Sequence, residues 1–195
     1  MRQAVVAMAV AILLSPIVAA DRLAAQKSQS SGLFFGFGFE PSSISASQSD
    51  SIDAGAGAGF TLGYGINRRW ALYGQLSTAE IDAGSGETYS LLHLDAGARV
   101  HFRTGPNTVV PFFQLGLTER LVDQEVSGSA VRGSGLGVTF GGGLNVHLAP
   151  TLAASVAIDY TVGSLSHFAV DGIPISGASV HAESARVYLG ILWFR

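Results

Sequence analysis

The sequence predicts an all-β protein, an eight-stranded antiparallel up-and-down transmembrane β-barrel. Three observations predict it. From Gly32 onward, apolar residues recur with a period of two, the period of a strand, instead of the 3.6 of a helix. Of the 195 residues, 48% are hydrophobic and only 13% are charged, whereas soluble domains carry about 25% charged residues. The connections between the alternating segments are short and long in turn, as in outer-membrane barrels.

Charge and cysteine content exclude several classes of protein. The chain has 14 acidic and 11 basic residues and a formal charge of −3, so we expect no nucleic-acid partner. It contains no cysteine, which excludes a disulfide scaffold, a cysteine-based metal site and a thiol nucleophile.

The N-terminus reads as an export signal. One positive charge at Arg2 precedes an apolar stretch over 4–14, Pro16 ends that stretch, and small residues reach a cleavage site after Ala20. A membrane-spanning helix would need about 20 apolar residues, more than this run supplies. We therefore predict a cleaved signal peptide over 1–20, a polar lead-in over 21–31 and the barrel over 32–195.

The rest of the chain divides into eight alternating segments. In each of them apolar residues share one face, and small or polar residues share the other. In the second segment, Phe60, Leu62 and Tyr64 alternate with Thr61 and Gly63. Each segment has at least the length of about 9–11 residues that a tilted strand needs to cross a bilayer. The predicted strands are 32–40, 54–66, 70–81, 89–103, 109–122, 135–148, 152–163 and 181–194.

The connections predict which end faces outward. Tight turns are expected at 67–69, 104–108 and 149–151, and long polar loops at 41–53, 82–88, 123–134 and 164–180. An even number of strands places both chain ends on the short-turn side. Loop 164–180 is unusually apolar for a surface loop, which makes it the best candidate for contact with a partner or a lipid.

A soluble lipocalin-like barrel is the alternative fold, because alternation does not say which face is outside. Its polar face would be rich in Lys, Glu, Asp and Arg. Here that face is mostly Gly, Ser, Thr, Asn and Gln, which suits the crowded interior of a narrow barrel. Trp70, Phe102 and Trp193 fall at strand ends on the short-turn side, as an interfacial aromatic girdle requires.

Ionisable residues on the small-residue face form a predicted polar network in the lumen. A lone buried charge is costly, so we expect ion pairs between Glu40 and Arg186, between Asp95 and Arg120, and between Asp159 and either Arg99 or Arg186. The network is interpreted as a plug that fills the barrel; the alternative is a gated pore in which two histidines titrate. The predicted members are Glu40, His93, Asp95, Arg99, His101, Arg120, Asp159 and Arg186.

No metal site and no cofactor are predicted. His93 and His101 lie eight residues apart on one strand, roughly 26 Å, and so cannot share an ion.

Two segments carry a resemblance to a known family. The fifth strand contains Val-Val-Pro-Phe-Phe-Gln-Leu-Gly-Leu over 109–117, and the chain ends on the aromatic strand 187–194. With the export signal and eight strands, the chain resembles the small outer-membrane β-barrels of the OmpA transmembrane-domain and OmpX type. The resemblance implies an outer-membrane location, a monomer in contact with outer-membrane lipids, and recognition by the barrel-assembly machinery. The signal for that machinery would lie in the last strand, at Tyr188, Gly190, Trp193 and Phe194.

The function predicted from these features is a non-enzymatic structural or surface-interaction role through the outward loops. One alternative is a small conduit for ions or hydrophobic molecules, and another is a secreted lipocalin-like binder. A third is a lipid A-modifying enzyme, because some eight-stranded barrels are deacylases with a His-x-Ser-Asn motif. The nearest match here begins at His167 and places Ala169 where the nucleophile belongs, with Glu183 downstream, so no catalytic residue is predicted.

Overall fold

In the computed structural model, the described residues are 31–46, 52–83, 88–102, 108–126 and 128–195. The predicted signal peptide over 1–20 lies outside them, as does the lead-in up to residue 30. The strands are β1 (Gly32–Phe39), β2 (Ser42–Ala46), β3 (Asp53–Gly65), β4 (Trp70–Asp82), β5 (Thr88–His101), β6 (Val109–Val126), β7 (Ser129–Ala149), β8 (Leu152–Leu165), β9 (His167–Val170), β10 (Ile173–Ile175) and β11 (Val180–Phe194).

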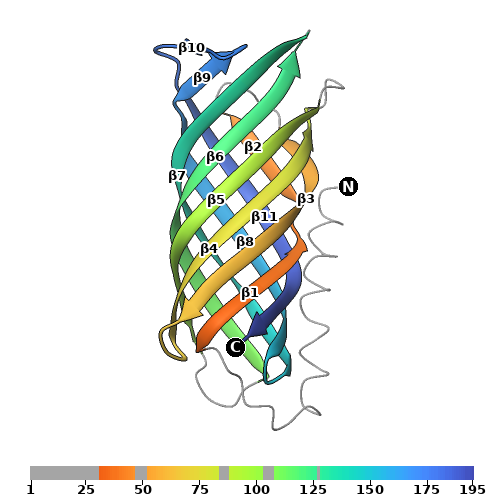
Figure 1. The fold of residues 1–195 in the computed structure, drawn as a ribbon, viewed down its shortest axis with the longest axis vertical. Helices are drawn as coiled ribbons and strands as arrows, with labels where there is room; N and C mark the ends of the chain where they lie inside the picture. Colours follow the sequence, from red (N-terminus) through yellow and green to blue (C-terminus); the bar gives the residue numbers. More distant parts are fainter. Residues whose placement is uncertain (1–30, 47–51, 84–87, 103–107, 127) are drawn as a thin grey trace.

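The strands form a closed antiparallel ring of tilted strands around one axis (Figure 1). Consecutive strands pair from β3 to β8, β8 pairs with β11, and β11 returns to β1 and β2. β1 and β2 keep a single register against both neighbours across Glu40 and Pro41, so together they are the first of eight barrel strands. The predicted eight-stranded up-and-down barrel is confirmed.

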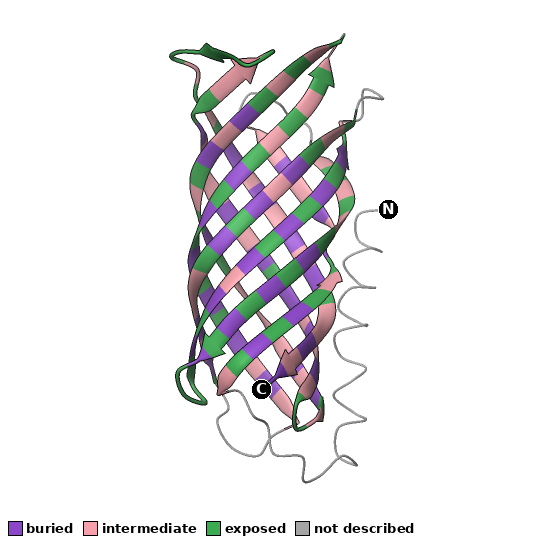
Figure 2. Cartoon of the chain, in the orientation of Figure 1, coloured by how far each residue is buried: buried purple, intermediate pink, exposed green. Residues whose placement is uncertain are grey.

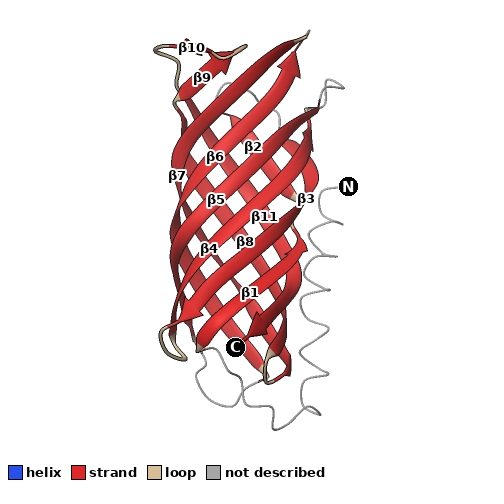
Figure 3. Ribbon diagram, viewed as in Figure 1, coloured by secondary structure: helices blue, strands red, loops and turns tan. Residues whose placement is uncertain are grey.

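Nearly all of the described secondary structure is strand (Figure 3). The described residues contain no helix long and apolar enough to cross a membrane.

Burial alternates along each strand (Figure 2). On β4, Trp70 and Leu72 point outward and are 48% and 54% exposed, whereas Tyr73 and Gln75 point into the lumen and are 5% and 4% exposed. The apolar face is therefore the outer one. This inversion suits lipid as solvent, because a closed ring pairs its backbone groups internally and presents apolar side chains to hydrocarbon.

Glycines on the inner face leave room for larger side chains from neighbouring strands. A Cβ atom at Gly59 would lie 1.9 Å from Oε2 of Glu40, and one at Gly63 would lie 2.2 Å from the ring of Phe34. An eight-stranded ring encloses little more than its own side chains. The glycine-rich inner face of β3 is thus the space that Glu40 and Phe34 occupy.

Three of the predicted long loops contain strands, which corrects the predicted boundaries. Most of segment 123–134 is paired strand, because β6 runs to Val126 and β7 begins at Ser129. β2 lies within 41–53, and the hairpin of β9 and β10 lies within 164–180 and pairs with β7. Near the loop end the strands contain few apolar residues, so the hydrophobic alternation is weak there. Periodicity alone therefore underestimates the length of these strands.

We expect Gly97→Ala to lower the free energy of unfolding by about 1–3 kcal/mol, the usual cost of overpacking. A Cβ atom at Gly97 would lie 2.2 Å from the carbonyl oxygen of Leu115, so the backbone of β6 would have to move. The measurement is urea unfolding in lipid vesicles, with the mobility of unboiled protein on gels as the test of folding.

The matched control is Gly74→Ala, where a Cβ atom meets its nearest neighbour at 3.7 Å. This variant should unfold within about 0.5 kcal/mol of the unmodified protein. Equal stability of the two variants would contradict the close-packed wall at Gly97.

Candidate functional site

The eight predicted lumen residues all point inward. Each is at most 4% exposed: Glu40, His93, Asp95, Arg99, His101, Arg120, Asp159 and Arg186. They come from four strands, β5, β6, β8 and β11, and from the junction between β1 and β2. Among them, three carboxylates face three guanidinium groups, so the inner charges balance.

Arg186 of β11 is the centre of the predicted network. Its Nη1 donates to Oδ2 of Asp95 at 2.7 Å and lies 3.4 Å from Oε1 of Glu40. It also donates to Ser77 at 3.1 Å. Both carboxylates are fully enclosed, so these ion pairs are shielded from water. The predicted pair of Glu40 with Arg186 is present.

A chain of hydroxyl groups holds the other oxygen of Asp95. Thr118 donates to Oδ1 through a short hydrogen bond, and Thr139 donates to the same atom at 3.3 Å. Thr139 in turn contacts Thr161 at 2.6 Å. The chain crosses β6, β7 and β8 on the inner face. Sequence reasoning did not include these threonines, although their inward parity on three successive strands was the available signal.

The predicted pair of Asp95 with Arg120 is wrong. The register of β5 and β6 places Thr118 opposite Asp95 and places His93 opposite Arg120. Arg120 instead donates from Nη1 to the backbone oxygen of Ala182 at 2.9 Å. The alternation of a strand shows which face a residue is on but not which residue of the next strand it is opposite. Asp95 and Arg120 are offset by two residues along their strands.

Arg99 reaches Asp159 through an amide relay and not through a direct ion pair. Its Nε and Nη2 both donate to Oε1 of Gln114, at 3.0 and 2.7 Å, and Nε2 of Gln114 donates to Asp159 at 2.6 Å. The guanidinium also lies over the ring of Phe112, 4.1 Å from its centroid. A desolvated cation gains from such an aromatic face.

Apolar clusters lie on both sides of the charged layer. Towards the short-turn end, the cluster consists of Phe34, Ala71, Tyr73, Ala153, Leu192 and Phe194. Towards the loop end, it consists of Ile44, Ala79, Ile81, Leu91, Leu165 and Ala182. Along β5, for example, Leu91 precedes His93, Asp95 and Arg99 on the inner face. The lumen is layered, with charge in the middle and apolar groups at each end.

The two predicted histidines have different surroundings. Nε2 of His93 lies 3.0 Å from the hydroxyl of Ser184, next to the charged layer. His101 lies near the short-turn end, with its ring edge-on to Phe112 at 6.3 Å. The structure also buries His147 fully, a residue that the predicted network omitted. Its ring is tilted against that of Phe194, with centroids 5.2 Å apart.

The predicted interfacial aromatics lie at the short-turn end of the outer wall. Trp70 and Phe102 are 48% and 65% exposed. Trp193 packs on Phe35, with ring centroids 5.7 Å apart. Of the residues predicted to carry the assembly signal, Trp193 is on the outer face, whereas Tyr188 and Phe194 are buried in the lumen at 5% and 4% exposure, and Gly190 shares their face.

A closed ring with an apolar exterior and a plugged polar interior defines a class, the small transmembrane β-barrel proteins. The chain belongs to the family with an outer membrane protein beta-barrel domain, whose model matches residues 10–188. The protein is therefore an outer-membrane protein, and the soluble lipocalin-like alternative is wrong.

Solved structures agree on the fold. Neisserial surface protein A (NspA) matches with a TM-score of 0.68 at 16% identity, over 85% of this chain and 98% of that one. OprG from Pseudomonas aeruginosa matches with a TM-score of 0.59 at 13% identity, over 85% and 97%. Ail, the attachment invasion locus protein of Yersinia pestis, matches with a TM-score of 0.56 at 14% identity, over 84% and 98%. No curated protein matches this sequence.

We expect Asp95→Asn to destabilise the barrel by about 3–5 kcal/mol, because it leaves the Arg186 cation short of a buried partner. Asp123→Asn is the matched control. Asp123 pairs with Arg132 at 2.7 Å on the exposed outer end, so its loss should cost under about 1 kcal/mol. Urea unfolding of both variants in vesicles measures the difference, and equal costs would contradict a structural role for the charged layer.

Proposed function

We propose that this protein is a non-enzymatic surface protein of the outer membrane that acts through its outward end. The charge distribution carries the proposal. Among the described residues, the loop end holds eight carboxylates, Asp53, Glu80, Asp82, Glu119, Asp123, Glu125, Asp171 and Glu183, against the single guanidinium of Arg132. At the short-turn end the described charged side chains are Arg68, Arg69 and Arg195.

The acidic outer end favours a positively charged partner. Long-range attraction between opposite charges guides a partner to such a surface and weakens as salt is added. Ail, which shares the fold, has been solved in complex with the heparin analogue sucrose octasulfate, a polyanion. The acidic outer end of this chain would repel a polyanion and favours a cationic peptide or protein instead.

The hairpin of β9 and β10 adds an apolar contact surface to this end. Ile173 and Ile175 are 71% and 47% exposed, and Asp171 lies two residues before Ile173 in the turn. The hairpin lies at the loop end, level with the outer ends of β6 and β7 (Figure 1). Exposed apolar groups beside acidic ones suit a partner that is both cationic and amphipathic. The proposed role needs a monomer, outer-membrane lipids as surroundings and the assembly machinery for insertion.

A conduit for ions or hydrophobic molecules is the second candidate, and the layered lumen argues against it. An ion entering from either end would have to pass an apolar cluster before reaching the charged layer. Transfer of a charge through such a layer is costly.

We expect the refolded protein to produce no stable single-channel steps in planar lipid bilayers at 100 mV, an applied potential of about 2.3 kcal/mol per elementary charge. The gel-mobility assay on the same sample verifies that the protein is folded. Reproducible discrete openings would favour the conduit.

We expect fluorescent poly-lysine to bind the protein in zwitterionic nanodiscs captured through a tag before Gly32, so that the loop end faces solution. The triple variant Glu80→Gln, Asp82→Asn, Glu125→Gln should bind at least threefold more weakly, and 0.5 M salt should abolish binding. Heparin is the polyanion control and should not bind. Preference for heparin, or unchanged poly-lysine binding in the triple variant, would overturn the cationic-partner proposal.

A further inference from the structure

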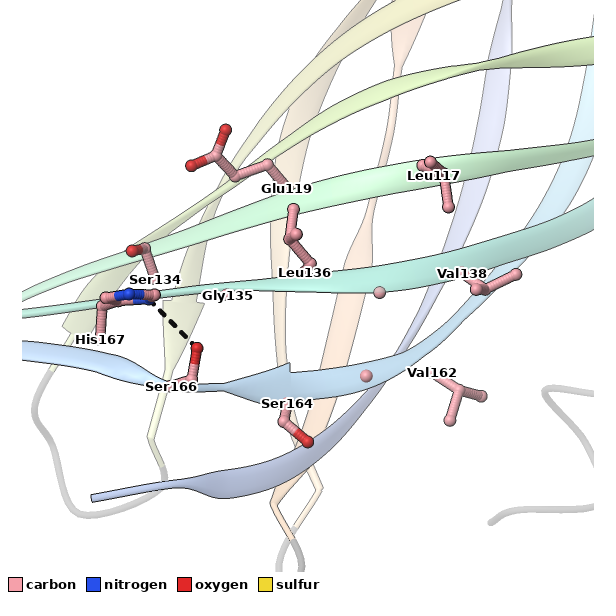
Figure 4. Close-up of a pocket in the computed structure, with 12 residues that line it drawn as sticks. Leu117, Glu119, Ser134, Gly135, Leu136, Val138, Val162, Ser164, Ser166 and His167 are labelled. Atoms are coloured by element: carbon pink, nitrogen blue, oxygen red, sulfur yellow. Dashed lines mark hydrogen bonds between the residues drawn. The ribbon is translucent and has the colours of Figure 1, made fainter. Parts of the chain in front are cut away.

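A groove runs along the outer wall between the side chains of β6, β7, β8 and the first residue of β9 (Figure 4). Its volume is about 650 Å³. The part nearer the short-turn end is lined by Leu117, Leu136, Val138 and Val162, and the part nearer the loop end by Glu119, Ser134, Ser164, Ser166 and His167. The groove is therefore apolar along one half and hydrogen-bonding at the other.

A β-bulge creates the polar half. β8 pairs with β7 in one register up to Gly163 opposite Gly137, and β9 resumes on β7 with His167 opposite Ser134, shifted by one residue. The backbone N–H of Ser166 donates to Ser134 at 2.9 Å within this shift. A bulge redirects side chains, and barrel rims commonly use one next to a site. Here it turns Ser166 and His167 to the outside in succession, and both are exposed.

The polar groups form one cluster. The Ser166 hydroxyl and Nδ1 of His167 are 3.1 Å apart, and this hydrogen bond lies on the groove side, facing Ser134 (Figure 4). Glu119 lies on the neighbouring β6. A Ser–His hydrogen bond alone does not make a nucleophilic site, which needs a third group that orients the base. The cluster supplies hydroxyl and imidazole groups for binding.

The groove crosses the edge of the lipid-facing belt. Along the outer face, β6 changes from Leu117 to Glu119, β7 from Leu136 to Ser134, and β8 from Val162 to Ser164. On all three strands the change from apolar to polar side chains occurs within the groove. Because the protein is in the outer membrane, this height is the boundary between acyl chains and head groups at the loop end of the barrel.

The exposed apolar side chains in the groove face lipid, so a lipid chain is its natural occupant. Leu136 and Leu117 are 72% and 68% exposed and form its raised walls. None of the twelve described residues that line the groove is a lysine or arginine, and Glu119 adds a negative charge. This lining favours a head group with hydroxyl, ester or ammonium groups over one with net negative charge.

We propose that the groove is a specific site for one membrane phospholipid at the loop end of the barrel. One acyl chain lies along Leu117, Leu136, Val138 and Val162, and the ester and ammonium-bearing head group meets Ser134, Ser166, His167 and Glu119. The site rests on the outer-membrane location and shares only Glu119 with the acidic loop end that carries the proposed function.

Native mass spectrometry of the mature barrel in detergent tests the site, with dioleoyl phosphatidylethanolamine as the titrated lipid. We expect one lipid to bind, and Val162→Trp, which fills the apolar half, to weaken its affinity about tenfold. Leu94→Trp is the matched control, since Leu94 is an outward residue of β5 that is 50% exposed and lies outside the groove. It should leave the affinity unchanged.

The head-group half has its own test. Dioleoyl phosphatidylglycerol, which has the same chains and a net negative charge, should bind more weakly than phosphatidylethanolamine, and Glu119→Gln should reduce that difference. Equal affinities of the unmodified protein, Val162→Trp and Leu94→Trp would overturn the site, because binding would then be general contact with the wall. Val162→Trp should bind poly-lysine as the unmodified protein does. Failure of the lipid site therefore shows only in lipid affinity, and failure of the proposed function only in poly-lysine binding.

Discussion

The structure depends on one constraint, that backbone N–H and C=O groups inside a lipid layer must be paired within the protein. A closed ring meets the constraint without a free edge, and here closure is the antiparallel pairing of β11 with β1 and β2. Pro41 sits within that closing pair and still contributes its carbonyl oxygen, which accepts from the N–H of Val187 at 3.0 Å. The narrowness of an eight-stranded ring then dictates glycine where bulky side chains cross the lumen.

Closure of the ring buries charged side chains in an interior that holds little water. These side chains are therefore paired with one another or with polar groups. Arg186 binds two carboxylates from different strands, Asp95 gathers hydroxyl groups from β6 and β7, and Gln114 connects Arg99 to Asp159. These contacts cross the lumen and therefore couple strands that are not neighbours in the sheet. A buried network of this kind specifies one register, because a shift of one residue would turn its members to the lipid face.

The interior that stabilises the barrel leaves its outer surfaces for interaction. The acidic side chains of the loop end and the apolar hairpin of β9 and β10 are exposed, and the groove beside His167 lies on the outer wall. The strands that carry the groove also carry the inner network, with Thr118 and Thr139 on the opposite faces of β6 and β7. The inner network therefore holds β6 and β7 in place, and these strands position the side chains of the groove.

The sequence alone determined the eight strands, the lipid-facing side and the inward position of all eight network residues, because a strand repeats its faces every two residues. Trp193, which the sequence predicts as an interfacial aromatic, lies on the outer face. Tertiary structure decided which residues pair, because the register of one strand against the next comes from strand pairing and not from the alternation within one strand. Asp95 therefore meets Arg186 instead of Arg120. It also decided the outer groove, because the bulge at Ser166 exists only when β8 and β9 pair with β7.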